Sequence, residues 1–203
     1  MKIFCVGRNY ADHAKELGNA VPEEPVIFMK PKTALLQPNT PFYYPEFSNE
    51  LHYEVELILR IAKNGKYIPE NQANKYYDAI SVGIDFTARD IQANLKKKGL
   101  PWEKAKAWDN SAVAGNWILL SDEMLNNPIH FSLNKNGEQV QLGDTRDMIF
   151  SFDHIVSHIS QYFSLNIGDM IYTGTPAGVG ECVSGDVLTG YLETKKMFEL
   201  EIK

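Results

Sequence analysis

The chain has 203 residues, of which 44% are hydrophobic and 11% aromatic, and its net charge is −6. This length suits one globular domain that buries roughly 70% of its unfolded surface. The acidic balance argues against nucleic-acid and anionic-membrane surfaces, and no apolar run approaches the ~18 residues of a membrane-spanning helix. Cys5 and Cys182 lack the spacing of a zinc or redox motif, so we expect buried thiols in a reducing compartment. The first residues do not resemble a signal peptide, and we expect a soluble, cytoplasmic protein.

The first half of the chain predicts short strands and helices around a proline-rich stretch. A strand over residues 3–6 precedes a short helix from Asn9 to Leu17, which Gly18 ends. Six prolines between residues 22 and 45 exclude a long helix there and favour short edge strands and turns. The other expected elements are a strand over 42–44, a strand over 51–62, a helix over 70–78, a strand over 79–86 and a helix over 89–98 closed by Gly99.

The second half reads mostly as strands. Asn136-Gly137 predicts a tight hairpin turn, and residues 148–163 predict an amphipathic helix. The expected strands cover residues 117–120, 129–135, 138–142, 170–173, 187–192 and 197–202. Many short strands with few helices indicate an α+β fold, mostly β, that forms a sandwich or roll rather than a doubly wound parallel sheet.

Glu54 and Glu56 alternate with apolar residues in the strand expected over 51–62. Residues i and i+2 of a strand point to the same face, so both carboxylates point one way and Val55 and Leu57 point the other. Like charges side by side repel and resist burial, and a divalent cation with oxygen ligands, such as Mg²⁺ or Mn²⁺, relieves both costs. The alternative is that both glutamates lie on a solvated face of the sheet.

A third carboxylate would complete such a metal site, and Asp85, at the end of the next strand, is the best candidate. Three carboxylates with waters or substrate make an ordinary octahedral Mg²⁺ arrangement. However, an aspartate between a strand and a helix also serves to cap the helix. The residues alone leave both possibilities open.

Three further features could take part in chemistry. His13 and Glu16 are three residues apart on the expected first helix, so the carboxylate can orient the imidazole as a base, unless both form a solvated surface pair. The glycine-rich loop over 173–180 can turn N–H groups toward an anion, although a tight turn between strands explains it too. Lys106 lies in a lysine-rich region, where a surface position is ordinary.

Five motifs occur in order along the chain, namely residues 6–13, the Glu-x-Glu at 54–56, and residues 85–92, 96–102 and 173–180. Together they resemble the fumarylacetoacetate hydrolase family, and especially its compact acylpyruvase and oxaloacetate decarboxylase-like branch. The resemblance runs from residue 5 to about residue 200, and five motifs in one order are far more specific than any one of them. The proline-rich stretch matches least, and we expect a lid hinge and substrate-selective contacts there.

The resemblance implies a mixed β-sandwich roll that forms a homodimer. It implies a single catalytic domain over residues 1–203, in which about residues 1–45 form the N-terminal strand, a lid helix and the proline-rich segment. It assigns Mg²⁺ or Mn²⁺ to three metal ligands, Glu54, Glu56 and Asp85. The implied catalytic residues are His13 and Glu16 on the lid helix with Lys106, and the implied substrate-binding residues are Arg89, Gln92 and Thr175.

The implied reaction is metal-dependent hydrolysis of a C–C bond in small 2,4-dioxo acids, the acylpyruvates, to pyruvate and a carboxylic acid. His13, polarised by Glu16, would activate water, and Lys106 would stabilise the developing negative charge. The alternatives are decarboxylation or keto–enol tautomerisation of oxaloacetate, and isomerisation or decarboxylation of 2-oxo dioic acids from aromatic degradation. A non-enzymatic ligand-binding protein that keeps these side chains is the remaining possibility.

Overall fold

The computed structural model describes residues 1–16, 18, 20–38 and 40–203. Strands dominate, as the sequence predicts. They are β1 (Ile3–Gly7), β2 (Val26–Lys30), β3 (Leu51–Tyr53), β4 (Val55–Ile61), β5 (Tyr77–Asp85), β6 (Thr87–Ala88), β7 (Ala112–Ala114), β8 (Ile118–Leu119), β9 (His130–Lys135), β10 (Glu138–Asp144), β11 (Met170–Tyr172), β12 (Gly180–Glu181), β13 (Val187–Leu192) and β14 (Lys195–Glu201). The α-helices are α1 (Ala11–Glu16), α2 (Arg89–Lys98), α3 (Glu103–Lys106), α4 (Asp122–Asn126) and α5 (Phe152–Tyr162), and the 3₁₀ helices are η1 (Lys32–Ala34), η2 (Glu70–Lys75) and η3 (Thr145–Asp147).

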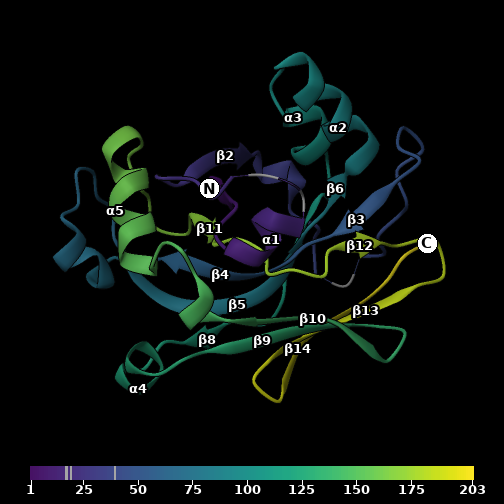
Figure 1. Ribbon diagram of the computed structural model, residues 1–203. Helices are drawn as coiled ribbons and strands as arrows, with labels where there is room; N and C mark the ends of the chain where they lie inside the picture. Colours follow the sequence, from purple (N-terminus) through teal and green to yellow (C-terminus); the bar gives the residue numbers. More distant parts are fainter. Residues whose placement is uncertain (17, 19, 39) are drawn as a thin grey trace.

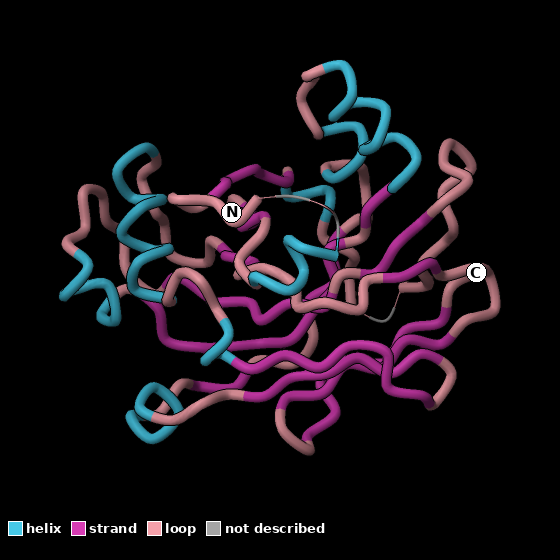
Figure 2. The backbone as a smooth tube through the Cα atoms, in the orientation of Figure 1, coloured by secondary structure: helices cyan, strands magenta, loops and turns pink. Residues whose placement is uncertain are grey.

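The strands of the described residues form three sheets. The largest has seven strands in the order β2-β1-β11-β4-β5-β7, with β8 also paired to β5, and its β1–β11 pair is parallel. A four-stranded sheet has the order β10-β9-β13-β14, and a small sheet joins β12, β3 and β6. Figures 1 and 2 show β4 and β5 curving through the centre, with the four-stranded sheet on one side and α1 on the other.

The two faces of β4 differ in what they bury. Val55, Leu57 and Leu59 are fully buried and belong to the main hydrophobic core, which also contains residues of β9 and β13. Ile58 packs on the opposite face with a smaller apolar cluster that includes Cys5. Because side chains alternate along a strand, Glu56 lies on this second face. The curved sheet therefore presents its acidic side chain away from the main core.

Strand pairing brings the acidic segments together at one end of β4 and β5. Glu56 lies opposite Gly83, and the Asp85 N–H donates to the Glu54 carbonyl oxygen over 2.9 Å. A Cβ atom at Gly83 would lie 1.9 Å from the Val113 carbonyl oxygen, so glycine is required for β7 to pair so closely. The close packing of β4, β5 and β7 fixes the positions of Glu56 and Asp85.

Several predicted elements are confirmed. Asn136 and Gly137 connect β9 and β10, and both have a positive φ, as a tight hairpin turn requires. Helix α2 spans residues 89–98 as predicted and ends at Gly99, whose φ of 64° is left-handed. Cys5 and Cys182 are buried free thiols. No helix among the described residues is long and apolar enough to cross a membrane.

Other predictions need correction. The strand expected over 51–62 is broken at Glu54, because β3 pairs with β12 and β6 whereas β4 pairs with β5 and β11. The helix expected over 70–78 is a 3₁₀ helix that ends at Lys75, since β5 begins at Tyr77. The helix expected over 148–163 begins at Phe152, where the Ser151 hydroxyl accepts a hydrogen bond from the His154 N–H.

Short elements were the least predictable. Helix α1 begins at Ala11 and ends at Glu16, and Leu17, the predicted last residue, lies outside the described residues. The strand expected over 42–44 is only an isolated bridge between Phe42 and Ile202. The sequence did not predict β2, β7, α3 or α4 as separate elements. Strand β2 is nevertheless an edge strand, which agrees with the expectation for the proline-rich stretch.

Candidate active site

Three carboxylates converge where β4 and β5 lie side by side. Glu54 follows β3, Glu56 is the second residue of β4, and Asp85 is the last residue of β5. Each offers an oxygen atom within 4.8 Å of the other two. All three residues are at most 5% exposed. The alternative of a solvated pair of glutamates is therefore wrong, and the predicted triad is assembled.

Burial and mutual repulsion affect the glutamates differently. Burial raises the pKa of Glu56 well above its ordinary value, and the charges of Asp85 and Glu54 raise it further. Burial would also raise the pKa of Glu54, but Lys106, Arg89 and His13 together hold it well below the usual range. Without a cation, Glu56 thus binds its proton more tightly than an ordinary glutamate does, whereas Glu54 favours the ionised form.

Lys106, at the end of α3, is a buried residue rather than a surface lysine. Its Nζ lies 2.6 Å from Glu54 Oε2 and 2.7 Å from Asp85 Oδ2. Burial would lower the pKa of Lys106, but Asp85 and Glu54 raise it above the ordinary value. The ammonium group therefore stays charged and joins two members of the triad.

Lys30 is a site residue that sequence reasoning missed. It ends β2, is 1% exposed, and its Nζ lies 2.7 Å from Asp85 Oδ1. The same ammonium donates to the Ser111 carbonyl oxygen and hydroxyl over 2.9 Å each, and also to the Lys106 carbonyl oxygen. Lys30 thereby joins the edge strand to the segment after α3 and compensates Asp85. A lysine beside prolines carries no local signal of such burial.

The donor set fits a hard divalent cation. Glu54, Glu56 and Asp85 supply only oxygen, the ligand that Mg²⁺ and Mn²⁺ prefer. Asp85 Oδ1 is buried and forms an ion pair with Lys30 over 2.7 Å, but it accepts no hydrogen bond from the described residues. A buried oxygen with unused capacity beside two further carboxylates is what a bound cation would satisfy.

Helix α2 adds cationic and amide groups beside the triad. Arg89 Nη2 lies 2.6 Å from Glu54 Oε1, and Arg89 Nη1 donates to Gln92 Oε1 over 2.7 Å. Arg89 Nε donates to His52 Nδ1 over 3.3 Å, and His52 Nε2 lies 2.9 Å from Glu50 Oε1. This chain of contacts fixes the guanidinium. The two predicted substrate-binding residues of α2 therefore lie together at the site.

Helix α1 brings a histidine to the cavity that the three carboxylates line. His13 is 5% exposed, and its Nδ1 lies 3.3 Å from Glu16 Oε2. Burial lowers the pKa of His13, although the Glu54 and Glu16 carboxylates partly oppose the shift. The Gly178 N–H donates to the Glu16 carboxylate over 3.1 Å and connects α1 to the glycine-rich loop. The alternative of a solvated His13–Glu16 pair is therefore wrong for the imidazole.

The glycine-rich loop after β11 also contacts the triad. The Gly174 N–H donates to Glu56 Oε2 over 2.7 Å, which turns one loop N–H toward an anion as predicted. Thr175 is 3% exposed and lines the cavity. Its hydroxyl accepts a hydrogen bond over 2.9 Å from Gln141, whose Oε1 accepts one from the Val55 N–H. Gln141, which the sequence did not indicate, thus connects the loop to the backbone between both glutamates.

The cavity enclosed by these groups is small, with a free volume of about 30 Å³. That is room for about one water molecule. Eight of the nine predicted site residues line this cavity, and the ninth, Glu16, contacts His13 Nδ1.

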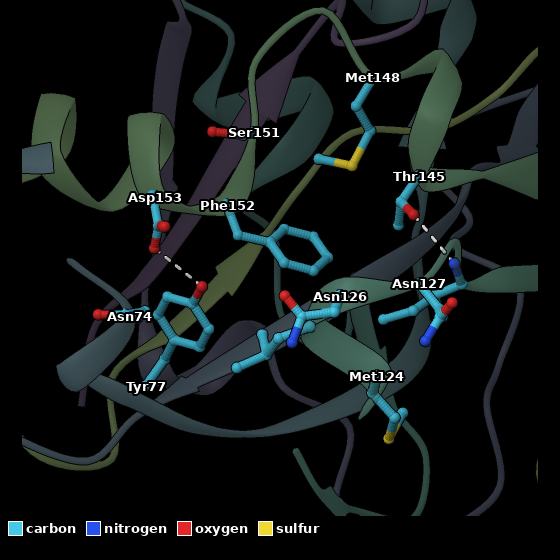
Figure 3. Close-up of a pocket in the computed structure, with 12 residues that line it drawn as sticks. Asn74, Tyr77, Met124, Asn126, Asn127, Thr145, Met148, Ser151, Phe152 and Asp153 are labelled. Atoms are coloured by element: carbon cyan, nitrogen blue, oxygen red, sulfur yellow. Dashed lines mark hydrogen bonds between the residues drawn. The ribbon is translucent and has the colours of Figure 1, made fainter. Parts of the chain in front are cut away.

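A larger cavity, of about 300 Å³, lies elsewhere between α4, β5 and the start of α5 (Figure 3). Its polar lining includes Asn74, Asn126 and Asn127, and the Tyr77 hydroxyl donates to Asp153 over 2.9 Å. Asp153 is the only charged group among the described residues that line it. It lacks the converging charges of the smaller cavity, which is the better candidate for chemistry.

Comparisons with known proteins agree with this site. The family described as "Fumarylacetoacetate (FAA) hydrolase C-terminal" matches residues 2–203. The chain is 45% identical to the oxaloacetate tautomerase YcgM of Escherichia coli over 93% of this chain and 86% of that protein. It is 41% identical to the mitochondrial oxaloacetate tautomerase FAHD1 of Homo sapiens over 91% of this chain and 83% of that protein.

A solved structure is similar over the whole chain. It is the fumarylpyruvate hydrolase of Pseudomonas aeruginosa in complex with Mn²⁺ and pyruvate. The TM-score is 0.93 with 35% sequence identity, and the match covers 100% of this chain and 89% of that chain. The bound Mn²⁺ in that relative agrees with the oxygen-only donor set of Glu54, Glu56 and Asp85.

Proposed function

Because the chain belongs to the fumarylacetoacetate hydrolase family, we propose that it is a divalent-metal-dependent enzyme for small 2-oxo acids whose main activity is keto–enol tautomerisation of oxaloacetate. The observation that carries the proposal is the convergence of three buried carboxylates and the His13 imidazole on one small cavity. The two similar proteins named as oxaloacetate tautomerases support the choice of reaction.

The residues around the triad suit a reaction that develops negative charge on a 2-oxo oxygen. A divalent cation held by Glu54, Glu56 and Asp85 would act as a Lewis acid toward such a substrate. Lys106 remains charged beside the triad and adds a fixed positive field there. Arg89 can hold the substrate carboxylate, because its own position is fixed by its contacts with neighbouring residues.

His13 is the candidate base. Its Nδ1 faces Glu16, so Nε2 is the ring nitrogen left to take a proton. Burial lowers the pKa of His13, so the imidazole is neutral near pH 7 and able to act. In tautomerisation, Nε2 removes a proton from C3 of oxaloacetate, and the 2-oxo oxygen takes up a proton to give the enol.

Hydrolysis of an acylpyruvate is the second candidate, and it would use the same His13–Glu16 pair to activate water. His13 would take a proton from a water that attacks the distal carbonyl carbon. The C–C bond then breaks, the three-carbon fragment takes up a proton to become pyruvate, and the acyl group leaves as a carboxylate. The solved relative named as a fumarylpyruvate hydrolase supports this reading.

Ultraviolet absorbance with purified protein and Mg²⁺ separates these reactions. We expect rapid, EDTA-sensitive interconversion of the oxaloacetate tautomers without formation of pyruvate. Pyruvate released from oxaloacetate would indicate a decarboxylase, and faster turnover of acetylpyruvate to pyruvate and acetate would indicate a hydrolase. Turnover of neither compound in the presence of Mg²⁺ would overturn the proposal. The homodimer and the cytoplasmic location stay predictions.

A further inference from the structure

Arg8 and Lys96 line the same cavity as the acidic triad. The ion pairs of the site are formed by Lys30, Lys106 and Arg89, and within the described residues neither Arg8 nor Lys96 takes part in one. Neither residue is fully exposed, so both charges lie partly out of water. Two half-buried cations without an acidic partner need an explanation.

The charge balance of the cavity indicates which kind of ligand it suits. Glu54 and Asp85 already form ion pairs with three cations, namely Lys30, Lys106 and Arg89. Arg8 and Lys96 are therefore in excess, and a divalent cation on the triad would add two more positive charges. A ligand with one carboxylate leaves most of this excess uncompensated, whereas a ligand with two carboxylates offsets it more fully.

Helix α2 places Lys96 on the face that points to the site. Arg89, Gln92 and Lys96 are spaced three and four residues apart, which puts them on one side of the helix. The Lys96 ammonium lies 5.4 Å from the ring centroid of Trp102, which limits where it can point. Burial lowers the pKa of Lys96, and the charges of Arg89 and Arg8 lower it further. An anion between these groups would relieve that repulsion.

Arg8 is held in an unusual backbone conformation between β1 and α1. Its φ of 63° is left-handed, which is unfavourable for a residue with a side chain. The next residue, Asn9, fixes this conformation because its side chain exchanges hydrogen bonds with the Phe150 backbone and donates to the Thr173 carbonyl oxygen. Strained residues of this kind concentrate at functional sites.

We propose that Arg8 and Lys96 form a subsite for the second carboxylate of a dianionic 2-oxo acid, at the end of the substrate remote from the 2-oxo group. The inference rests on the proposed function and narrows its substrate class to short dicarboxylates such as oxaloacetate. Acetylpyruvate carries a neutral acetyl group where oxaloacetate has its second carboxylate, so it lacks the negative charge that these two residues would bind.

The test compares dianionic with monoanionic ligands in Lys96→Met, Arg8→Gln and the double variant. We expect kcat/KM for oxaloacetate to fall about 10- to 100-fold in each single variant, mainly through KM, since each loses a charged contact. Turnover of acetylpyruvate and competitive inhibition by pyruvate should not change. Lys97→Met is the matched control, because Lys97 is the exposed neighbour on α2 and does not line the cavity. An equal loss for both classes of ligand would overturn the subsite.

Calorimetric titration of the Mn²⁺-loaded protein separates this inference from the proposed function. If oxaloacetate binds more tightly than pyruvate and Lys96→Met removes the difference, the subsite stands even where no turnover is found. If turnover is confirmed but the variants bind both ligands as the wild type does, the subsite is wrong and the proposed function survives. The melting temperature of Lys96→Met should change little, because the variant loses both the repulsion from Arg89 and Arg8 and the contact with the Trp102 ring.

Discussion

The acidic triad and helix α1 face the same cavity but are supported in different ways. Glu54, Glu56 and Asp85 sit at the ends of paired strands, are buried, and are held by two buried lysines. Helix α1 has six residues, and its Glu16 is held to the rest of the site through the Gly178 N–H. The triad thus belongs to the paired strands, whereas His13 is carried by a short helix outside the sheets.

This difference suggests that the triad serves metal binding and α1 serves proton transfer. Changes in the triad should alter metal binding and the stability of the fold together, since its charges are part of the buried structure. Changes in α1 should alter the rate of proton transfer and leave metal binding intact. Variants in the triad and in α1 test whether metal binding and proton transfer depend on separate parts of the site.

Asp85→Asn should have the largest effect. Lys30 and Lys106 both contact the Asp85 carboxylate, so the neutral amide leaves the buried Lys30 without a carboxylate partner and Lys106 with Glu54 alone. We expect the free energy of unfolding to fall by about 3–5 kcal/mol in urea titrations, with loss of Mn²⁺ binding. Asp12→Asn, which breaks an exposed pair with Lys15, is the control and should change stability by less than about 1 kcal/mol. Equal stability of both variants would show that the lysines do not depend on Asp85.

His13→Ala should affect catalysis alone. Loss of the base should lower kcat about 10²- to 10⁴-fold, while calorimetry should give an unchanged Mn²⁺ affinity. If hydrolysis of acetylpyruvate occurs, it should suffer far more than any decarboxylation of oxaloacetate, which needs no hydrolytic base. His154→Ala, on α5 and outside the cavity, is the control. A parallel loss of metal affinity would contradict the division between triad and helix.

Glu56→Gln should separate metal binding from stability within the triad. Burial and the neighbouring carboxylates raise the pKa of Glu56, so in the metal-free wild type folding must bind a proton there that the unfolded chain releases as pH rises. The amide removes that cost, so the unfolding free energy should match the wild type below about pH 4.5 and exceed it at neutral pH, and the amide oxygen still accepts from the Gly174 N–H. Loss of a residue that only supports a metal ligand typically weakens metal binding about 10–100-fold. Glu56 is itself a proposed ligand, so its replacement should weaken Mn²⁺ binding by more than that. An unchanged affinity would remove Glu56 from the metal site.

The raised pKa of Glu56 also predicts how the stability and the metal affinity depend on pH. In the metal-free protein the native state binds this proton more tightly than the unfolded chain does. Stability from this group is therefore present below the ordinary pKa of 4.5 and is lost as pH rises toward the raised value. A cation must displace the same proton, so Mg²⁺ affinity should rise with pH over this interval. Titrations in buffers of different ionisation enthalpy would count the released proton, and a pH-independent affinity would contradict the account.

Gln141→Leu should have the smallest effect. The Gln141 side chain accepts from the Val55 N–H and donates to Thr175, so leucine leaves a buried N–H unpaired at a cost of about 1–3 kcal/mol. We expect a modest loss of stability, a weaker Mn²⁺ affinity and a higher KM. Thr175→Val removes the loop contact alone and should raise KM without weakening Mn²⁺ binding. Identical profiles for the two variants would show that Gln141 does not act on the glutamates.

Much of the site could be predicted because its residues obey local rules. The alternation of Glu54 and Glu56 with apolar neighbours placed both carboxylates on one side, and the structure confirms that they converge. Helix α2 and the hairpin at Asn136 carried clear capping and turn signals. Asp85 was ambiguous by itself, since capping explained it equally well. The ordered motifs of the family resemblance were needed to choose between the readings.

The parts that could not be predicted depend on contacts between distant segments. Lys30 lies in a proline-rich stretch, and only the pairing of β2 with β1 carries it to Asp85. The strand break at Glu54 arises because the residues on either side pair with different sheets. Gln141 reaches the site from β10, where the strand register shifts between Gln139 and Gln141. Local periodicity carries no information about such pairings.

The most direct test of the central claim titrates Mn²⁺ into metal-free protein while oxaloacetate tautomerisation is measured on the same samples. We expect one tightly bound Mn²⁺ per chain and activity that rises in proportion to the Mn²⁺ occupancy. Glu56→Gln should lose both the bound Mn²⁺ and the activity. Full activity after verified removal of all divalent metal would contradict the central claim.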